Sequence, residues 1–179
     1  KILEKYFETE ILKELKEDKS PVTIADRESE DVIKKTIHES FADHAFLGEE
    51  TGRTEHESEY VWHVDPIDGT RNFANGIPLF VVSIALVFKQ RLIVGVEYNP
   101  ITKSLFYAED GKGAYLNNKR IFVSKDDESQ GMMTVSTSKK QTDQKLYRAL
   151  MHDLPGGRVV RSVRDIGCAA LDLAYVARG

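Results

Sequence analysis

The sequence has a single cysteine, Cys168, and this scarcity excludes two kinds of site. One cysteine cannot form a disulfide within the chain, and a zinc site built from thiolates needs several. A chain without disulfides fits a reducing compartment, so we expect a cytoplasmic protein. There is no Gly-x-Ser-x-Gly motif, and we expect Cys168 to be a small buried residue and not a nucleophile.

Long apolar runs and an excess of positive charge are also missing. The longest apolar run, residues 79–88, is interrupted by Ser83 and is shorter than the roughly 18 residues of a membrane-spanning segment. Lys and Arg number 25 and Asp and Glu 29, so the net charge is −4. This balance favours neither nucleic acid nor a membrane as a partner. A phosphorylated substrate would need a local positive centre, and a bound cation is one answer.

Apolar residues recur at helical spacing in the N-terminal part of the sequence. They predict a first helix from Ile2 to Leu15, which is ended by the Ser-Pro pair at residues 20–21. Asp26 stands where an N-cap would begin a second helix, and this helix is expected to continue to Phe41.

The period changes to two from Tyr60 onward, which is typical of β-strands. Residues 61–64 predict a strand that stops at Asp65, because Pro66 has no N–H for a neighbouring strand. Asn117-Asn118 is a hairpin turn signal between two later strands. The other predicted strands form an antiparallel meander, with a turn at residues 90–91, and comprise residues 79–88, 92–98, 104–108, 114–116 and 120–123.

The polar segment at residues 124–131 is the best candidate for a domain boundary. We expect an α+β metal-binding domain over residues 1–130 and the start of an α/β domain over residues 131–179, because strands and helices alternate beyond the boundary. The predicted elements of the second part are strands at residues 132–136 and 158–163 and helices at residues 142–153 and 168–177. The sequence starts inside a predicted helix and ends directly after another, so we expect the native chain to continue.

Asp65 and Asp68 follow a predicted strand in the run Asp-Pro-Ile-Asp-Gly-Thr. Two carboxylates this close repel each other, and a hard divalent cation such as Mg²⁺ relieves the repulsion. Gly69 permits an unusual backbone conformation, and residues 70–73 open a helix whose N–H groups suit a phosphate. Taken alone, however, the run is equally compatible with an ordinary turn.

Two further acidic positions precede this run. Glu49 follows a short apolar strand at residues 46–47, so it too lies at a strand end. Taken separately, Glu49 could belong to an exposed loop, and Asp26 could do no more than cap a helix. Their occurrence in this order with Asp65 and Asp68 is more specific and indicates a metal site.

These residues and their context resemble the inositol monophosphatase family of Mg²⁺-dependent, lithium-sensitive phosphatases. The resemblance covers nearly the whole chain and is carried by residues 20–26 (Ser-Pro-Val-Thr-Ile-Ala-Asp), 48–50 (Gly-Glu-Glu), 62–73 (Trp-His-Val-Asp-Pro-Ile-Asp-Gly-Thr-Arg-Asn-Phe) and 167–177. It implies a layered sugar-phosphatase fold, an αβαβα sandwich with a meander sheet between helices. It also implies a hydrolase that attacks a phosphate monoester with metal-activated water and forms no covalent intermediate.

The resemblance also implies two to three Mg²⁺ ions in the site. Glu49, Asp65 and the carbonyl of Ile67 would hold the first ion. Asp65 and Asp68 would hold the second, and Glu49 with water molecules a weaker third. One further aspartate ligand is expected beyond Gly179.

The roles of the remaining site residues follow from the same resemblance. Thr70, supported by Asp26 and Glu49, would orient the attacking water and help to deprotonate it. The backbone N–H groups of Gly69 and Thr70 would bind the phosphate. The residues expected near the hydroxyl-bearing ring of the substrate are Gly167 and Ala169.

The resemblance leaves the substrate open among small phosphorylated metabolites. Inositol monophosphate ranks first because residues 167–173 resemble the corresponding segment of inositol monophosphatases. Histidinol phosphate ranks second because the sequence of residues 20–27 is similar to that of bacterial histidinol phosphatases. Fructose 1,6-bisphosphate and adenosine bisphosphates are further options. A regulatory or binding homologue with weak catalysis is the alternative of another class, and a homodimer is possible because relatives commonly form one.

Overall fold

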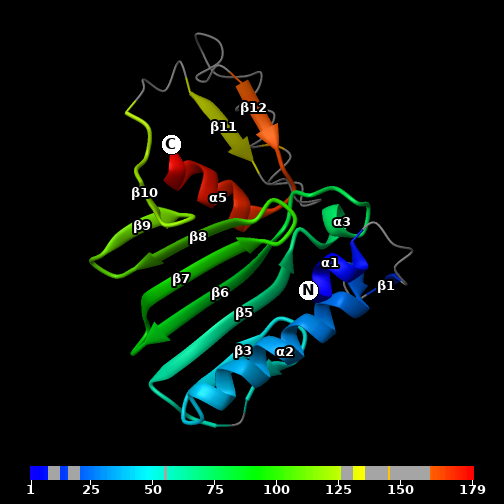
Figure 1. Ribbon diagram of the computed structural model, residues 1–179, viewed down its shortest axis with the longest axis vertical. Coiled ribbons are helices and arrows are strands. Elements are labelled where there is room, and N and C mark those ends of the chain that lie inside the picture. The colour runs from blue at the N-terminus through cyan, green and yellow to red at the C-terminus, as the bar shows by residue number, and fades with distance from the viewer. Residues whose placement is uncertain (8–12, 16–20, 55, 126–130, 136–144, 146–161) are drawn as a thin grey trace.

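The computed structural model describes residues 1–7, 13–15, 21–54, 56–125, 131–135, 145 and 162–179. Within these residues the main element is a mixed sheet of eight strands (Figure 1). Its strands are β3 (Ala45–Gly48), β4 (Gly52–Arg53), β5 (Tyr60–Asp68), β6 (Val81–Phe88), β7 (Arg91–Asn99), β8 (Ser104–Glu109), β9 (Gly113–Leu116) and β10 (Lys119–Ile121). They lie side by side in the order β10-β9-β8-β7-β6-β5-β3-β4.

The strands from β5 to β10 pair antiparallel with their neighbours in sequence, which confirms the predicted meander. Asn117 and Asn118 join β9 to β10 with φ angles of 46° and 66°, as expected for a tight hairpin turn. The turn between β6 and β7 contains residues 89–90, one position earlier than predicted, because Phe88 pairs with Arg91.

β3 differs from the meander because it runs parallel to β5. Gly48 is paired with Val64, so β3 ends at the edge of the sheet where the acidic run of β5 begins. The residues that follow, Glu49 and Asp65, are thereby brought together, and the Glu49 N–H donates to the Val64 carbonyl at 3.0 Å. The sequence predicts the end of β3 before Glu49 but not the parallel pairing of β3 with β5.

β5 continues past Pro66, so the prediction that this strand stops at Asp65 is wrong. Asp65 pairs with Ser83 and Asp68 with Val81, and the register shifts between these two pairs. Proline is tolerated in such an irregular stretch because no ladder hydrogen bond requires its missing N–H. The irregularity lets the strand extend through the whole acidic run.

The N-terminal helix is shorter than its periodicity predicts. Helix α1 (Ile2–Tyr6) ends at Tyr6, and residues 8–12 of the predicted helix lie outside the described residues. Residues 13–15 form a strand, β1 (Lys13–Leu15), which pairs antiparallel with β2 (Pro21–Thr23). The helical prediction is therefore wrong at residues 13–15, where pairing with another strand overrides local periodicity.

Helix α2 (Ile24–Ser40) begins before Asp26, so the prediction that Asp26 is its N-cap is wrong. Asp26 instead lies in the first turn of the helix, where a negative charge interacts favourably with the helix dipole. Asp26 is only 2% exposed, whereas a residue that only caps a helix end can remain exposed to solvent.

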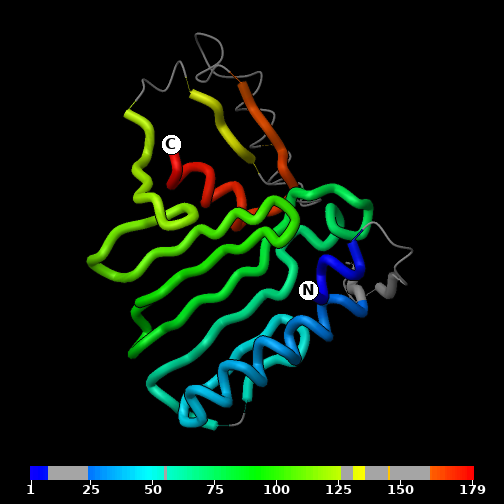
Figure 2. The backbone as a smooth tube through the Cα atoms, in the orientation of Figure 1, coloured from blue at the N-terminus to red at the C-terminus, as the bar shows by residue number. Residues whose placement is uncertain are grey.

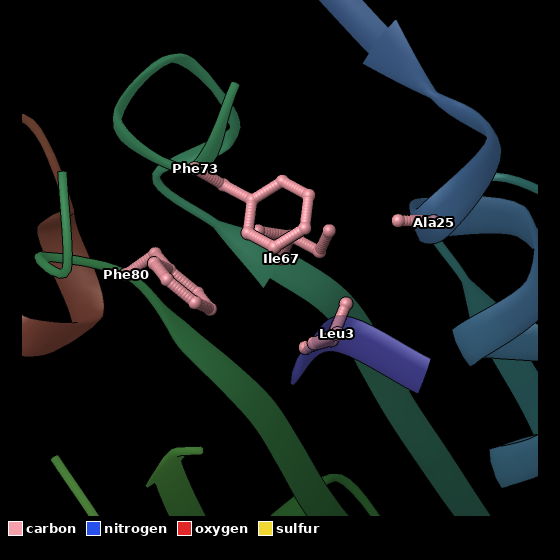
Figure 3. Close-up of a cluster of buried hydrophobic side chains, with 5 residues drawn as sticks. All are labelled: Leu3, Ala25, Ile67, Phe73 and Phe80. Carbon is pink, nitrogen blue, oxygen red and sulfur yellow. The ribbon is translucent and has the colours of Figure 1, made fainter. Parts of the chain in front are cut away.

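Helices cover both faces of the sheet, which confirms the layered fold. On one face α1, α2 and α3 (Thr70–Phe73) surround a core of Leu3, Ala25, Ile67, Phe73 and Phe80, shown in Figure 3. Val82 packs against this core, whereas its neighbour Val81 packs with Cys168 and Leu171 of the α5 (Ala169–Arg178) region. Because successive strand residues point to opposite faces, α5 lies on the other side.

The C-terminal part contains two strands outside the main sheet. β11 (Met132–Val135) and β12 (Ser162–Asp165) pair in parallel and form a sheet of their own. They confirm most of the predicted strand at 132–136 and the end of the one at 158–163. Residues 158–161 and, apart from Lys145, the predicted helix at 142–153 lie outside the described residues.

The C-terminal end of α5 returns to the edge of the main sheet. Figure 2 shows the end of the tube beside the segment that follows β10, and the backbone of Gly179 approaches that of Phe122 and Ser124. Among the described residues, no helix combines the length and the apolar character needed to cross a membrane.

Candidate functional site

Three acidic residues predicted as metal ligands gather at the shared edge of β3 and β5. The carboxyl of Asp65 is hydrogen-bonded to that of Glu49, and Asp68 lies near it. Burial and these two carboxylates raise the pKa of Asp65 to about 8, although the Ile67 N–H, 3.0 Å from Asp65 Oδ1, favours ionisation. Ionisation of a half-buried carboxyl beside two other carboxylates is unfavourable, and a cation bound there would favour it.

Asp68 connects this edge to helix α5. Its Oδ2 accepts a hydrogen bond from the Ala170 N–H at 2.5 Å, in the first turn of the helix. The Cys168 thiol donates to the Asp68 carbonyl at 3.2 Å. Cys168 is buried as predicted, and burial raises the pKa of its thiol well above the ordinary value, so the thiol stays protonated. One oxygen of Asp68 is thus engaged by the protein.

Thr70 begins α3 directly after the acidic run. Its hydroxyl donates to the carbonyl of Ile67 at 3.0 Å, which ties the predicted water-orienting group to the predicted carbonyl ligand. Asp26 lies in the first turn of α2, and strand β2 contacts both α2 and α3. The structure therefore brings the segments that carry Asp26 and Thr70 close to the same strand.

Gly69 has a backbone conformation and a location that both require glycine. Its φ is +94°, and a Cβ built there would lie 2.9 Å from the Leu79 carbonyl oxygen and 3.2 Å from Cys168 Cβ. These neighbours belong to the loop before β6 and to the residue before α5, so neither can move freely. Gly69 allows three segments to meet behind the acidic edge.

Gly69→Ala is expected to lower the free energy of unfolding by about 2 kcal/mol or more, because it adds both strain and a backbone clash. Gly111→Ala is the matched control, since Gly111 has φ +74° but open space around the added Cβ. Urea denaturation of both variants separates the two contributions. Equal losses of stability would show that close packing at Gly69 is unimportant.

Asn72 is a site residue to which sequence analysis gives no structural role. Its side-chain amide donates to the Leu79 carbonyl at 2.7 Å and to the Ile166 carbonyl at 2.8 Å. It also contacts the backbone of Gly167, which has φ +73°. Asn72 thus fixes the segment that contains the predicted substrate-binding residues Gly167 and Ala169 against α3.

Glu97 is a second residue that the sequence reading missed. Asp65, Ser83 and Glu97 are paired in turn across β5, β6 and β7, and the Ser83 hydroxyl donates to Glu97 Oε1 at 2.9 Å. Glu97 Oε2 is buried with no hydrogen-bond partner among the described residues. Burial raises the pKa of Glu97 to about 7, the bond from Ser83 opposes this rise, and Asp68 adds to it.

The raised pKa of Glu97 predicts how stability depends on pH. The folded protein holds the proton more tightly than the unfolded chain, so stability falls as the pH rises from about 4.5 to about 7. Glu97→Gln stays neutral and should raise the free energy of unfolding by about 1–2 kcal/mol at pH 8, with no gain at pH 4. Denaturation in EDTA across this range checks the prediction, and Glu109→Gln, on the exposed end of β8, is the control for the substitution itself.

The donor set fits Mg²⁺ better than a metal that prefers nitrogen or sulfur. In the part of the chain that the structure describes, no three His, Cys, Asp or Glu side chains form a ready-made metal cage. Mg²⁺ does not need one, because it is bound through one or two carboxylates and keeps several water molecules. Asp65, Asp68 and the Ile67 carbonyl offer oxygen donors only, and Glu49 extends the set.

Comparison with known proteins matches the chain to one family over its whole length. The model of the inositol monophosphatase family matches residues 1–179. A fructose-1,6-bisphosphatase/inositol-1-monophosphatase of Aquifex aeolicus is 41% identical over 169 residues, covering 93% of this chain and 63% of the relative. A Pasteurella multocida protein named Nus factor SuhB is 41% identical over 168 residues, covering 92% of this chain and 62% of the relative.

The fold agrees with these matches. The solved structure of an inositol monophosphatase from Thermotoga maritima is 32% identical and has a TM-score of 0.88, covering 99% of this chain and 67% of that one. The chain spans 62–63% of the length of the two curated relatives described above. Because the family model and the solved structure both match across nearly all residues, the chain belongs to the inositol monophosphatase family.

Proposed function

We propose that the full-length protein hydrolyses a small phosphate monoester with Mg²⁺, and that inositol monophosphate is the first candidate substrate. The observation that carries this proposal is the convergence of Glu49, Asp65 and Asp68 at one sheet edge, directly before α3. Family membership supports the reaction class, because Mg²⁺-dependent phosphatases are typical of this family.

Four groups of this chain would hold the metal ions: the carboxylates of Glu49, Asp65 and Asp68 and the carbonyl of Ile67. When bound, Mg²⁺ lowers the pKa of a coordinated water and neutralises charge on the phosphate and the leaving oxygen. The raised pKa of Asp65 supports this assignment, because a cation would offset the repulsion among the carboxylates. A further aspartate from beyond Gly179 would complete the set.

The other residues would position the substrate and the attacking water. The Thr70 hydroxyl would orient the water, with Asp26 and Glu49 supporting it. The N–H groups of Gly69 and Thr70 would hold the phosphate oxygens. The residues proposed to face the rest of the substrate, on the segment fixed by Asn72, are Gly167 and Ala169.

Phosphate release by the full-length protein tests the proposal. The substrates are inositol 1-phosphate, histidinol phosphate, fructose 1,6-bisphosphate and an adenosine bisphosphate, each with Mg²⁺ and with EDTA. We expect Mg²⁺-dependent release, fastest with inositol 1-phosphate. Faster release from histidinol phosphate would reassign the substrate, and no release from any compound would refute the reaction class.

One alternative of another class follows from a relative's name. The Pasteurella multocida protein is called a Nus factor. A protein of this kind could act by binding a partner, with little or no turnover. The same assay distinguishes the two functions, because a binding protein would release little or no phosphate from all four compounds.

We also propose the domain arrangement and setting expected from the sequence. An α+β domain would comprise residues 1–130, and residues 131–179 would begin a second, α/β domain. The separate pairing of β11 with β12 supports this division. A cytoplasmic homodimer is the proposed form, and light scattering of the full-length protein measures its mass.

A further inference from the structure

Glu30 is a buried carboxylate outside the acidic edge, and it contacts the turn that carries Glu49. It projects from α2, and its side chain is fully buried. Its Oε2 accepts the N–H of Glu50 and its Oε1 accepts the N–H of Thr51, both at 2.8 Å. Each oxygen of the carboxylate therefore binds one backbone group of the turn.

These two bonds complete the anchoring of the turn. The preceding N–H, that of Glu49, donates to the Val64 carbonyl of β5 at 3.0 Å. Three successive N–H groups of the turn thus have partners outside it, one on β5 and two on α2. Hydrogen bonds to a carboxylate are stronger than those between neutral groups, so the Glu30 side of the anchor is firm.

Gly48 makes room for the Glu30 carboxylate. A Cβ at position 48 would lie 2.1 Å from Glu30 Oε1 and 2.7 Å from Oε2. The side chain of Glu30 thus occupies the space that any other residue at position 48 would fill. The short strand β3 ends in glycine because a carboxylate from α2 must pass there to reach the turn.

We propose that Glu30 is a positioning residue, which holds the 49–51 turn so that the Glu49 carboxylate meets Asp65 at the metal edge. Glu30 touches neither substrate nor metal and acts only through the turn. The inference rests on the proposed function, because it assigns Glu49 to the metal site. It deepens that function by naming the group that sets the location of this ligand.

Two substitutions at Glu30 distinguish the effect of side-chain length from the effect of the carboxylate group. Glu30→Gln keeps the length of the side chain but replaces one acceptor oxygen with an NH₂ group, which faces a backbone N–H. Glu30→Asp keeps both acceptors and the charge but is one methylene too short to reach the turn. Gly48→Ala displaces the same carboxylate from the other side without changing it.

Glu28→Gln is the matched control. Glu28 lies on the same helix, and its Oε1 accepts the Tyr6 hydroxyl at 2.9 Å, away from the 49–51 turn. It undergoes the same chemical change as Glu30→Gln. A general loss of helix stability would affect both variants, whereas displacement of Glu49 would affect only the Glu30 variants and Gly48→Ala.

The experiment measures Mn²⁺ binding to the full-length protein by electron paramagnetic resonance, at a temperature where every variant is folded. Amide hydrogen exchange at Glu50 and Thr51 is the second readout. We expect Mn²⁺ affinity to fall about 10- to 100-fold in both Glu30 variants and in Gly48→Ala, as for other groups that orient metal ligands. Exchange at the two amides should accelerate, and Glu28→Gln should change neither readout.

The outcomes distinguish the inference from the proposed function. Unchanged Mn²⁺ affinity in the two Glu30 variants overturns the positioning role even if phosphate is released normally. Equal loss in Glu28→Gln also overturns it. If the variants lose affinity but the wild-type protein releases no phosphate from any substrate, the positioning role stands and the proposed reaction fails. A wild-type protein that binds no Mn²⁺ overturns both.

Discussion

Asp68→Asn is expected to lower phosphate release by the full-length protein about a hundred- to a thousandfold, the size of effect seen when a group that stabilises transition-state charge is removed. The substitution removes one negative charge from the proposed Mg²⁺ site. It leaves an oxygen that can still accept the Ala170 N–H, which Asp68 Oδ2 binds at 2.5 Å. The start of α5 should therefore remain in place, and the fold with it.

Steady-state kinetics at saturating Mg²⁺, together with urea denaturation, checks this expectation. Asp110→Asn is the control, because Asp110 pairs with Arg91 on the exposed β8–β9 side and has no place in the proposed site. We expect Asp68→Asn to change the free energy of unfolding by less than about 1 kcal/mol. Retained turnover in this variant would refute the role assigned to Asp68.

Phe73→Ala should lower the free energy of unfolding by about 3–5 kcal/mol, which is large compared with the total stability of a domain. The ring is completely buried among Leu3, Ala25, Ile67 and Phe80 (Figure 3). It packs edge-on to Phe80, with ring centroids 4.9 Å apart. Its removal leaves a cavity below α3, the short helix that begins with Thr70.

Chemical denaturation measures the loss, and Phe122→Ala is the control. Phe122 is 68% exposed, so its truncation should change stability by no more than about 0.5 kcal/mol. Because the cavity lies under α3, we also expect slower phosphate release at temperatures where Phe73→Ala is still folded. A stability loss equal to that of Phe122→Ala would contradict the assignment of Phe73 to the core.

The sequence predicts those features that depend on residue type and on where an apolar stretch ends. Glu49 and Asp65 each follow an apolar stretch of sequence, and the structure brings them together at one edge. The hairpin at Asn117-Asn118 was predictable because both residues readily adopt positive φ angles. These features depend on a few neighbouring residues, so a single sequence contains them.

The features that could not be predicted depend on residues far apart in the chain. Glu30 shares a helix face with Ile33 and Ile37, but a charged side chain is usually exposed, so its burial is not expected from the sequence. Its burial follows from a glycine at position 48, on a different element. Likewise, the sequence around Glu97 is that of an ordinary strand. Only the pairing of Glu97 with Ser83, and of Ser83 with Asp65, places Glu97 in line with the acidic run.

Two of the wrong boundaries have the same origin. Residues 13–15 carry helical periodicity, yet the partner strand at 21–23 decides their conformation. Pro66 would end an isolated strand, yet the irregular pairing between Asp65 and Asp68 accommodates it. In both places, pairing with a neighbouring strand determines the backbone conformation and overrides the local sequence preference.

The hydrogen bond between Asp68 and Ala170 has a consequence for the order of folding. It joins residues 102 positions apart, and the bond from Asn72 to Ile166 spans 94. Contacts of such long range tend to form late, because the entropy cost of closing a large loop comes before the contact can stabilise the fold. The strand carrying the acidic run can pair with its neighbours much earlier. We therefore expect β5 to pair with its neighbours before α5 docks against Asp68.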